Sequence, residues 1–587
     1  MNKRKNFFRS LKSFVPYLMA YPKELISAVL LGLASGVTSV MMTYYIGVAV
    51  DQMADQGQVD FPHLFAILRL FAGLFLVTVL SQYLIQRIGN RVAYESVAKL
   101  RDETFTHLNQ LPLNYYDQSS QGDIVSRFTN DMDNISTAVS AVFNQVFSGM
   151  TVVLVALVFM LYLSPLLTLV VLVATPIIFL LTYIVARTSQ KYFTSQQKIV
   201  GQISGFVTEM VGNQKIVKAF QREAVNQHNF ETINQELYVR GQKAQFASSL
   251  TNPSSRFVDH LAYLMVGFVG GLLALQGGHG ITIGIISSFT IYSSQFTKPF
   301  IELSGITIQL QTAVAGLDRS FELLDQPIEK PDAADAEQLT KVKGEVVFDQ
   351  VYFSYRPNQK LIEDFNLTVQ PGETIAIVGK TGAGKSTLVN LLMRFYEVDQ
   401  GQIRIDGTDI RQITRDSLRK NFGMVLQETW LMDSSLRANL RYGRKEASDE
   451  EIFAALKDAY MYEFVLRLPK KLDTVVGEAG LKLSDGQRQL LTIARTMISR
   501  PPMLILDEAT SSVDTLTEQN IQQAFLNMME GHTSFVIAHR LSTIKNADKI
   551  LVLDQGHVVE IGSHAELLKK DGYYHRLYQA QFSQQEI

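Results

Sequence analysis

The sequence contains no cysteine, and this absence excludes a disulfide framework, a thiolate zinc site and a thiol nucleophile. An excess of charge is also missing, because 54 lysines and arginines stand against 56 aspartates and glutamates in 587 residues. The resulting net charge of −2 argues against a nucleic-acid-binding protein. Charged residues make up 19% and hydrophobic residues 47%, which excludes a disordered chain, and the length allows several domains.

Charged residues are missing altogether from long runs in the first half of the chain. The run 134–186 has none and is long enough for two membrane-spanning helices of about 20 residues each, with Ser164-Pro165 as the turn. The run 261–297 has only His279 as a titratable group, and glycines at 277–280 break it in the same way. Any one run could be a buried core helix, but their number favours a membrane domain. The expected spans are about 24–50, 63–88, 136–163, 165–187, 256–276 and 282–316.

Basic residues predict how these spans are oriented. Lysines and arginines cluster within residues 3–12 and in the connections 88–133 and 188–255, whereas the loop between the first two spans has none. Because such residues favour the cytoplasmic side, we expect a cytoplasmic amino terminus and a cytoplasmic second half of the chain. Both long connections are interpreted as a helix, a break and a helix, with breaks near 113–125 and 211–222. Each tip is suited to docking on another domain, or is a plain solvated hairpin.

The composition changes after a proline-containing stretch at 326–343. Short β-rich runs such as 375–378 and 504–506 then alternate with helical stretches, which is typical of an α/β domain. We therefore expect an α-helical membrane domain over 1–325, in which six transmembrane helices have long cytoplasmic extensions. After the linker 326–343, an α/β P-loop nucleotide-binding domain should occupy 344–587.

A glycine-rich loop follows the apolar strand 374–378 and opens a helix at 387–396, which is the context that a P-loop requires. Glycines let backbone N–H groups turn inward around phosphates, and the helix N-terminus adds positive potential. Lys385 can reach the β- and γ-phosphates and Ser386 can ligate Mg²⁺, although a chance glycine-rich turn is the alternative. The predicted nucleotide-binding residues of this loop are Gly379, Lys380, Thr381, Gly382, Ala383, Gly384, Lys385, Ser386 and Thr387.

Two further apolar strands end in polar residues. The strand 503–506 runs into Asp507, which fits an Mg²⁺ ligand, and Glu508, which can polarise an attacking water. The strand 534–538 ends at His539. Exposed carboxylates or a lone histidine are commonplace in isolation. Because open α/β sheets bind ligands at the carboxyl ends of their strands, we expect these residues to lie beside the P-loop.

Between these strands, residues 483–487 read Leu-Ser-Asp-Gly-Gln and lead into a helix. The order of P-loop, Gln427, this motif, Asp507-Glu508 and His539 resembles an ATP-binding cassette (ABC). Six spans followed by such a cassette resemble a half-transporter of the ABC exporter family, of the multidrug-exporter kind. The resemblance covers essentially the whole chain, and the combined motifs are specific although each one alone is not.

The resemblance implies further roles and the cofactors ATP and Mg²⁺. The catalytic set is Glu508, His539 and Gln427, and the metal set is Ser386, Gln427 and Asp507. Outside the family, Gln427 would be an ordinary surface residue and Tyr355 a core tyrosine. The remaining implied residues are Tyr355, which stacks on adenine, Glu478, which touches the intracellular helix tips, Asp514, in a loop that crosses to the other cassette, and the signature residues Ser484, Asp485, Gly486 and Gln487.

Asp485 departs from the family's signature, which has glycine at this position. In the family, each ATP lies between the P-loop of one cassette and the signature of the other. A carboxylate ~4–6 Å from the γ-phosphate would repel it by ~3–4 kcal/mol at an effective dielectric near ~20. The P-loop, Asp507 and Glu508 of this chain are intact. The asymmetry favours a heterodimer with a second ABC half-transporter, and a homodimer that tolerates Asp485 is the alternative.

The sequence therefore predicts ATP-driven export of hydrophobic or amphipathic compounds, drugs or lipids, across a bacterial cytoplasmic membrane. The alternatives are a homodimeric lipid or drug flippase and an ATP-gated channel or regulator, whereas fusion of spans and cassette disfavours an importer. No nucleic-acid partner is expected. Four titratable residues in or next to the fifth and sixth spans either line a substrate cavity or pair near the membrane interface: Asp259, His260, Lys298 and Glu302.

Overall fold

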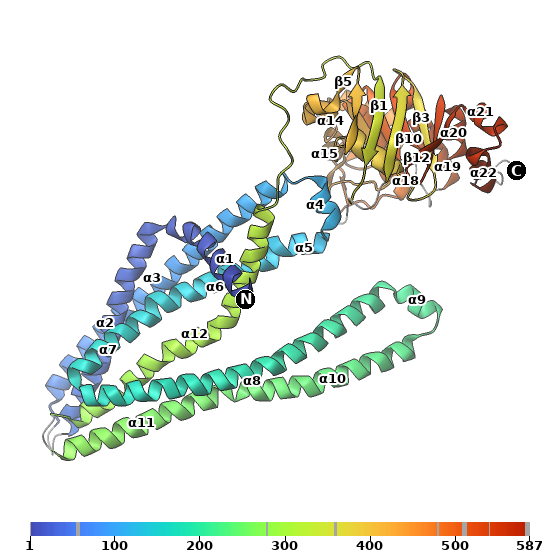
Figure 1. Cartoon of the computed structure of the whole chain (residues 1–587). Helices are drawn as coiled ribbons and strands as arrows, with labels where there is room; N and C mark the ends of the chain where they lie inside the picture. The colour runs from blue at the N-terminus through green and yellow to red at the C-terminus, as the bar shows by residue number, and fades with distance from the viewer. Residues whose placement is uncertain are drawn as a thin grey trace. The chain divides into compact units, whose positions relative to one another are not determined.

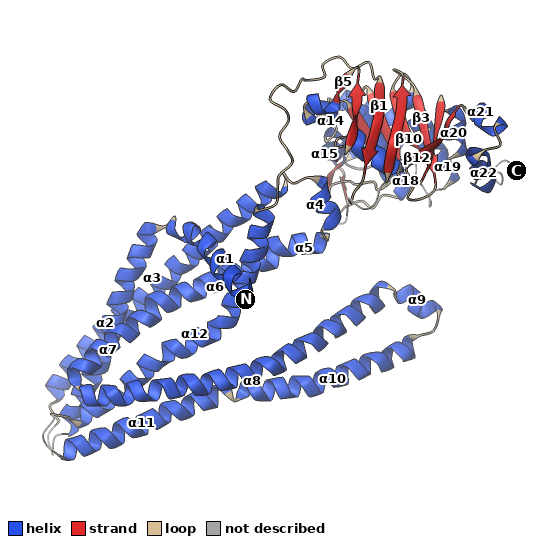
Figure 2. Cartoon of the chain, in the orientation of Figure 1, coloured by secondary structure: helices blue, strands red, loops and turns tan. Residues whose placement is uncertain are grey.

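The computed structural model of the protein is drawn in Figures 1 and 2. It describes residues 2–54, 59–276, 280–356, 361–477, 480–507, 514–538 and 540–581. The chain divides into two compact units, and each is described by itself. The first consists of Met1–Leu111 and Ser119–Ile328, and the second of Pro112–Gln118 and Glu329–Ile587.

The described part of the first unit is helical (Figure 2). Its helices up to the first tight turn are α1 (Asn2–Met19), α2 (Pro22–Ala54), α3 (Phe61–Leu108), α5 (Gln121–Ser126), the π-helix η1 (Arg127–Asp131), α6 (Met132–Asn144), the π-helix η2 (Gln145–Met150) and α7 (Thr151–Leu163). The remaining helices are α8 (Pro165–Gly212), α9 (Gln214–Ala219), α10 (Glu223–Ser249), α11 (Thr251–Leu275) and α12 (Ile283–Leu324).

The turn between α7 and α8 shows how the sequence ends one long helix and begins the next. Ser164 has extended dihedral angles, φ −160° and ψ 106°, and its side chain accepts a hydrogen bond from the backbone N–H of Leu167. Pro165 follows at the first helical position, where no backbone donor is needed. The chain therefore reverses with one residue outside a helix.

The long connections contain extended helical arms. Helix α3 continues to Leu108, and α8 runs over 48 residues before ending at Gly212. Helix α10 packs alongside α8, and the short helix α9 lies at the tip between them (Figure 1). Helices α8 and α10 thus form a helical hairpin, and its break falls in the stretch 211–222.

Length and hydropathy single out three helices of the described chain that could span a membrane, Pro22–Met53, Phe61–Leu108 and Gln121–Leu163. The bent pair Ile283–Thr307 and Gln309–Leu324, with 41° between its parts, would be a fourth. Shorter apolar helices lie at Pro165–Ile177 and His260–Leu275. Each of the six predicted spans overlaps one of these helices, and the number of six stays a prediction.

The second unit is an α/β domain with two larger sheets. A sheet of four antiparallel strands has the order β2-β1-β4-β5, and a sheet of six strands has the order β12-β11-β3-β10-β9-β6. The strands are β1 (Val346–Phe353), β2 (Ile362–Val369), β3 (Thr374–Gly379), β4 (Gln400–Ile405), β5 (Thr408–Asp409), β6 (Phe422–Val425), β9 (Met503–Asp507), β10 (Thr533–Ile537), β11 (Lys549–Asp554) and β12 (His557–Gly562), with the short pair β7 (Ser434–Ser435) and β8 (Val475–Val476).

The helices of this unit include the short α4, which the chain order places between α3 and α5. They are α4 (Leu113–Gln118), α13 (Lys385–Leu392), α14 (Arg415–Lys420), α15 (Leu436–Arg441), α16 (Asp449–Asp458), α17 (Tyr462–Arg467), α18 (Asp485–Ser499), α19 (Thr515–Met529), α20 (Leu541–Asn546), α21 (His564–Lys569) and α22 (Tyr573–Gln581), with 3₁₀ turns η3 (Ile410–Gln412) and η4 (Lys471–Asp473).

The central strands of the six-stranded sheet are buried on both faces. In β3, Ile375 and Ile377 pack into one hydrophobic cluster, whereas Ala376 and Val378 pack into the other. This division follows from the two-residue period of a strand, and it explains the uninterrupted apolar run in the sequence. The strands β3, β10, β9 and β6 are mutually parallel, so their carboxyl ends share one edge.

The stretch predicted as a linker is held on the second unit by ion pairs. The guanidinium of Arg415, whose side chain is 9% exposed, lies 2.7 Å from the Asp332 carboxylate and 3.0 Å from that of Glu397. Arg419 is 2.8 Å from Glu329. Charges this poorly solvated require close partners, so the acidic residues of the linker fix its path over the domain.

Candidate nucleotide site

The predicted catalytic edge forms where the parallel strands end. Ile537 of β10 is level with Ile377 of β3 and with Asp507 of β9, so these strands end at the same edge of the sheet. The prediction that Glu508 and His539 lie beside the P-loop stays a prediction. Gln427 follows β6, whose Val425 is level with Leu506. Glu508 comes directly after β9, and His539 follows β10 after Ala538; both lie outside the described residues.

The glycine-rich loop curls between β3 and α13 through two residues with positive φ. Gly382 has φ +83° and Gly384, the N-cap of α13, has φ +98°. Residues with a Cβ are strained at these angles, which is why the turn requires glycine. The Nζ of Lys385 reaches back over the loop and donates to the backbone carbonyls of Gly379, at 2.8 Å, and Lys380, at 3.1 Å. The lysine side chain thus folds back over the loop.

Electrostatics link this loop to Asp507. Partial burial lowers the pKa of Lys385, and the negative charge of Asp507 opposes that shift. Ser386 is exposed at the second position of α13. A hydroxyl and a carboxylate suit Mg²⁺, which keeps several waters and takes one or two protein carboxylates together with phosphate oxygens. Among the described residues no group of three or more His, Cys, Asp or Glu could hold a metal ion.

Tyr355 lies beside the helix that follows the loop. Its hydroxyl donates to Thr387 Oγ1 at 3.4 Å and accepts from Asn390 Nδ2 at 3.0 Å, and both partners belong to α13. Its ring meets Phe353 and Tyr396 edge-on, with centroids 4.9 and 5.0 Å apart. The side chain remains partly exposed. The geometry therefore brings the residue predicted to stack on adenine next to the P-loop helix.

Tyr396 connects this aromatic cluster to α4. Its hydroxyl donates a hydrogen bond to the Asp117 carboxylate, and burial together with that carboxylate raises the pKa of Tyr396. Asp117 lies within the break near 113–125 that the sequence predicted as a docking tip. Sequence reasoning missed Tyr396, because it stands in no motif and its partner is 279 residues away.

The signature segment forms the start of α18. Ser484 is the N-cap, and its Oγ accepts a hydrogen bond of 3.2 Å from the N–H of Gln487. The Gln487 side chain in turn accepts from the N–H of Ser484 at 3.0 Å, which completes a capping box. Gly486 is buried, whereas Asp485, the first residue of the helix, is 64% exposed.

Two other residues implied by the resemblance have different outcomes. Asp514 is the N-cap of α19, where its carboxylate accepts from the N–H of Thr517 at 3.0 Å, and this backbone hydrogen bond lowers the pKa of Asp514. Its predicted role across a dimer stays a prediction. Glu478 lies outside the described residues.

The charged residues of the last membrane helix are exposed in the first unit. On α12, Lys298 Nζ is 4.0 Å from Glu302 Oε1, and their side chains are 73% and 49% exposed. Gly305 and Gln309 continue the same exposed face at helical spacing. His260 of α11 is also exposed, and the side chain of Asp259 lies outside the described residues.

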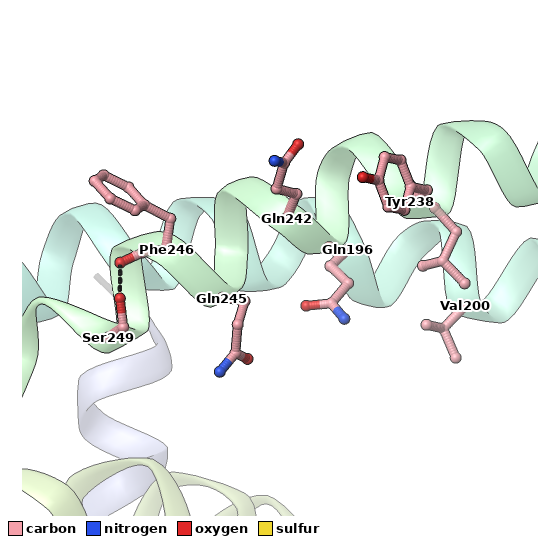
Figure 3. Close-up of a pocket in the computed structure, with 9 residues that line it drawn as sticks. Gln196, Val200, Tyr238, Gln242, Gln245, Phe246 and Ser249 are labelled. Atoms are coloured by element: carbon pink, nitrogen blue, oxygen red, sulfur yellow. Dashed lines mark hydrogen bonds between the residues drawn. The ribbon is translucent and has the colours of Figure 1, made fainter.

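A groove of about 580 Å³ lies along the hairpin of α8 and α10 (Figure 3). It belongs to the connection predicted to be cytoplasmic, and none of the predicted nucleotide or substrate residues lines it. Its lining residues are Gln196, Val200, Leu237, Tyr238, Gly241, Gln242, Gln245, Phe246 and Ser249.

Comparison with known proteins gives two family matches that together cover both units. The family described as "ABC transporter transmembrane region" matches residues 25–300, and the family described as "ABC transporter" matches residues 362–511. A bacterial Atm1-family ABC exporter solved with ATP bound is similar with a TM-score of 0.76 and 29% identity, over 96% of this chain and 99% of that one.

Three relatives show the range of names among similar proteins. The uncharacterised ABC transporter ATP-binding protein YfiC of Bacillus subtilis is 39% identical over 99% of this chain and 95% of its own length. A fatty acid ABC transporter ATP-binding/permease protein of Mycobacterium bovis is 41% identical over 89% of this chain and 82% of its own length. An ATP-dependent lipid A-core flippase of Acinetobacter baylyi is 35% identical over 93% of this chain and 94% of its own length.

Proposed function

The chain belongs to the ABC transporter family, and from this premise we propose that it exports hydrophobic or amphipathic compounds across the bacterial cytoplasmic membrane as one half of a heterodimer. The family and fold already establish a coarser statement. The chain is a multi-pass half-transporter of the exporter type, and its cassette binds ATP and couples ATP hydrolysis to transport.

The substrate class rests on the exposed face of α12. Lys298 and Glu302 lie within the sixth predicted span, where charged side chains facing lipid are costly. The polar face of α12 that carries these two residues favours a water-filled path through the membrane. The apolar remainder of α12 suits a substrate that has a hydrocarbon part. The relatives named as a fatty acid transporter and a lipid A-core flippase handle amphipathic lipids, which supports the same class for this chain.

The proposed chemistry takes place at the carboxyl edge of the six-stranded sheet. The P-loop backbone and Lys385 would bind the phosphates of ATP, and the exposed ring of Tyr355 would stack on adenine. Glu508 would orient the attacking water, with His539 and Gln427 beside it. Mg²⁺, when bound by Ser386, Asp507 and Gln427, would neutralise part of the negative charge of the phosphates. Closure of two cassettes on ATP would switch the spans outward.

The heterodimer rests on Asp485. Its exposed carboxylate stands at the start of α18, where the family offers backbone N–H groups to the γ-phosphate of an ATP bound by the other cassette. This chain's own P-loop and Glu508 keep the family's residues. We propose that a partner supplies an intact signature to this chain's P-loop, and that Asp485 faces the partner's P-loop in a site of slow turnover.

Transport into sealed vesicles tests the function. The chain, tagged and purified from its own membranes with any accompanying half-transporter, is reconstituted and given ATP with a fluorescent phospholipid analogue or an amphipathic dye. We expect ATP-dependent flux that Glu508→Gln abolishes. ATP hydrolysis without flux of any amphipathic probe would favour a regulator or channel, and full flux by this chain without a partner would favour the homodimeric flippase.

A further inference from the structure

Asp485 is paired within its own helix. Its carboxylate accepts a hydrogen bond from the guanidinium of Arg488, one turn further along α18. The other guanidinium nitrogen of Arg488 donates to the backbone carbonyl of Leu483 at 3.0 Å. The arginine thus spans the signature from the residue before the N-cap to the residue after it.

These two bonds hold Arg488 at the helix start. Its side chain is 39% exposed, so the guanidinium is neither buried in the cassette nor fully solvated. Arginine suits this position because its planar fork can serve a carbonyl and a carboxylate at once. Asp485 and Arg488 are also three residues apart, so their side chains lie on one face of the first turn of α18.

The pair changes the charge that a phosphate would meet. Asp485 by itself would set a full negative charge against the positive end of the helix dipole, which amounts to roughly half a charge. With Arg488 in contact, the two side chains sum to zero, and the dipole and N–H groups of α18 remain attractive to an anion. Ser484 accepts its capping bond through Oγ, so its hydroxyl proton remains available as a donor.

We infer that Arg488 is a positioning residue that neutralises Asp485 and thereby keeps the signature of this chain able to hold the γ-phosphate of ATP bound by the opposing cassette. This inference rests on the proposed nucleotide site. It adds that the site built on Asp485 retains ATP instead of standing empty, and that retention depends on one arginine.

A double-substitution cycle measures this dependence. The transporter, purified with its partner and placed in lipid nanodiscs, carries Glu508→Gln throughout so that ATP held at this chain's own P-loop is a constant background in every variant. Radiolabelled ATP retained beyond that background after rapid washing gives the ATP concentration for half-saturation of the site that contains Asp485. We expect Arg488→Gln to raise that concentration about tenfold or more, because an uncompensated charge ~4–6 Å away opposes phosphate. In the Asp485→Gly background, the same substitution should change it less than about twofold.

Two variants separate charge from structure. Arg488→Lys keeps the positive charge and should restore most of the affinity, whereas a purely structural role in holding the Leu483 carbonyl would not be rescued by it. Lys420→Gln removes an equal charge from an exposed ion pair with Asp416 elsewhere on the cassette, and it should leave the half-saturation concentration unchanged.

The inference is overturned if Arg488→Gln has no effect, or if its effect is as large with glycine at position 485 as with aspartate. It is also overturned if no variant retains ATP beyond the background of this chain's own P-loop, because then no phosphate reaches the signature. The vesicle flux assay, which does not use Arg488, tests the proposed function separately.

Discussion

At the scale of single residues, Lys385 combines two properties that oppose each other. It must carry a positive charge to attract phosphates, yet partial burial disfavours that charge and lowers the pKa of the ammonium group. The carbonyls of Gly379 and Lys380 accept its hydrogen bonds and keep it folded over the loop. Removing the Lys385 side chain should therefore abolish ATP binding while leaving the fold largely intact.

This balance predicts how ATP binding depends on pH. Because the pKa of Lys385 lies below the ordinary lysine value, the side chain loses its proton earlier as the pH rises. The charged form is the one that binds phosphate, so the KM for ATP should increase on the alkaline side, before ordinary lysines titrate. Steady-state ATPase assays across alkaline pH measure this rise. Lys385→Arg, which stays charged, should flatten the profile, and an unchanged slope in that variant would contradict the assignment.

At the scale of secondary-structure elements, a hydrogen bond that can be removed alone joins Tyr396 to Asp117 of α4, in the same unit. Tyr396→Phe deletes the hydroxyl that donates to Asp117 but keeps the ring against Tyr355. Since α4 lies in the chain between α3 and α5, we expect ATP hydrolysis to persist while the flux per ATP falls several-fold, in line with about 1 kcal/mol for such a bond.

The matched control for this prediction is Tyr573→Phe, which deletes another tyrosine–aspartate hydrogen bond, 2.9 Å long, to Asp554 of the same unit. Flux and hydrolysis are measured on the same vesicles. An equal fall of both activities in Tyr396→Phe would show damage to the nucleotide site instead of lost coupling.

An ion pair between a buried carboxylate and a partly exposed arginine joins η1 to α12 within the first unit. The Asp131 carboxylate, with a side chain only 5% exposed, accepts from Arg319 at 2.8 and 2.5 Å. Asp131→Asn removes the charge at nearly constant volume and should destabilise the membrane unit by about 1–3 kcal/mol. Loss of the monodisperse elution peak on heating in detergent measures the effect.

Asp133→Asn is the control for this ion pair, because Asp133 is 79% exposed and lies 3.6 Å from Arg101. Surface pairs of this kind contribute little, so its midpoint temperature should match that of the unsubstituted protein. Equal midpoints for both variants would show that the pair with Arg319 adds nothing to stability.

The elements also show what sequence reasoning could reach. Apolar runs ending in Gly379 and Asp507 predicted strands of an α/β domain with polar residues at their carboxyl ends, because strand period and glycine geometry act locally. The bond between Tyr396 and Asp117 depends on tertiary packing over 279 residues, and no local pattern encodes it. The pairing of Asp485 with Arg488 is short-range, but it becomes visible only once Ser484 is fixed as the N-cap. The ion pair of Arg415 with the linker residue Asp332, 83 residues away, depends on tertiary packing, as the bond between Tyr396 and Asp117 does.

At the scale of the whole molecule, the proposed assembly shares each nucleotide site between two chains, so the choice of partner would decide the activity. A homodimer would contain two intact P-loops and two copies of Asp485, whereas a heterodimer would place an intact signature opposite Glu508. Compensation by Arg488 restores the charge balance but not the small glycine that the family has at position 485. Retention of ATP and its rapid turnover are therefore separate properties of this chain.

The ATPase rate of the chain in lipid, with and without its partner, tests this separation. Purified alone, the chain should hydrolyse ATP at least about tenfold more slowly than the co-purified assembly, because every composite site then carries the larger side chain of Asp485 in place of glycine. Asp485→Gly should raise the rate of the chain alone, since it removes both the carboxylate and the bulk. Glu508→Gln should silence the co-purified assembly, which shows that the measured turnover belongs to this chain's own catalytic edge. A chain that hydrolyses ATP rapidly by itself, with no gain from Asp485→Gly, would make the homodimer the working assembly and would remove the need for a partner.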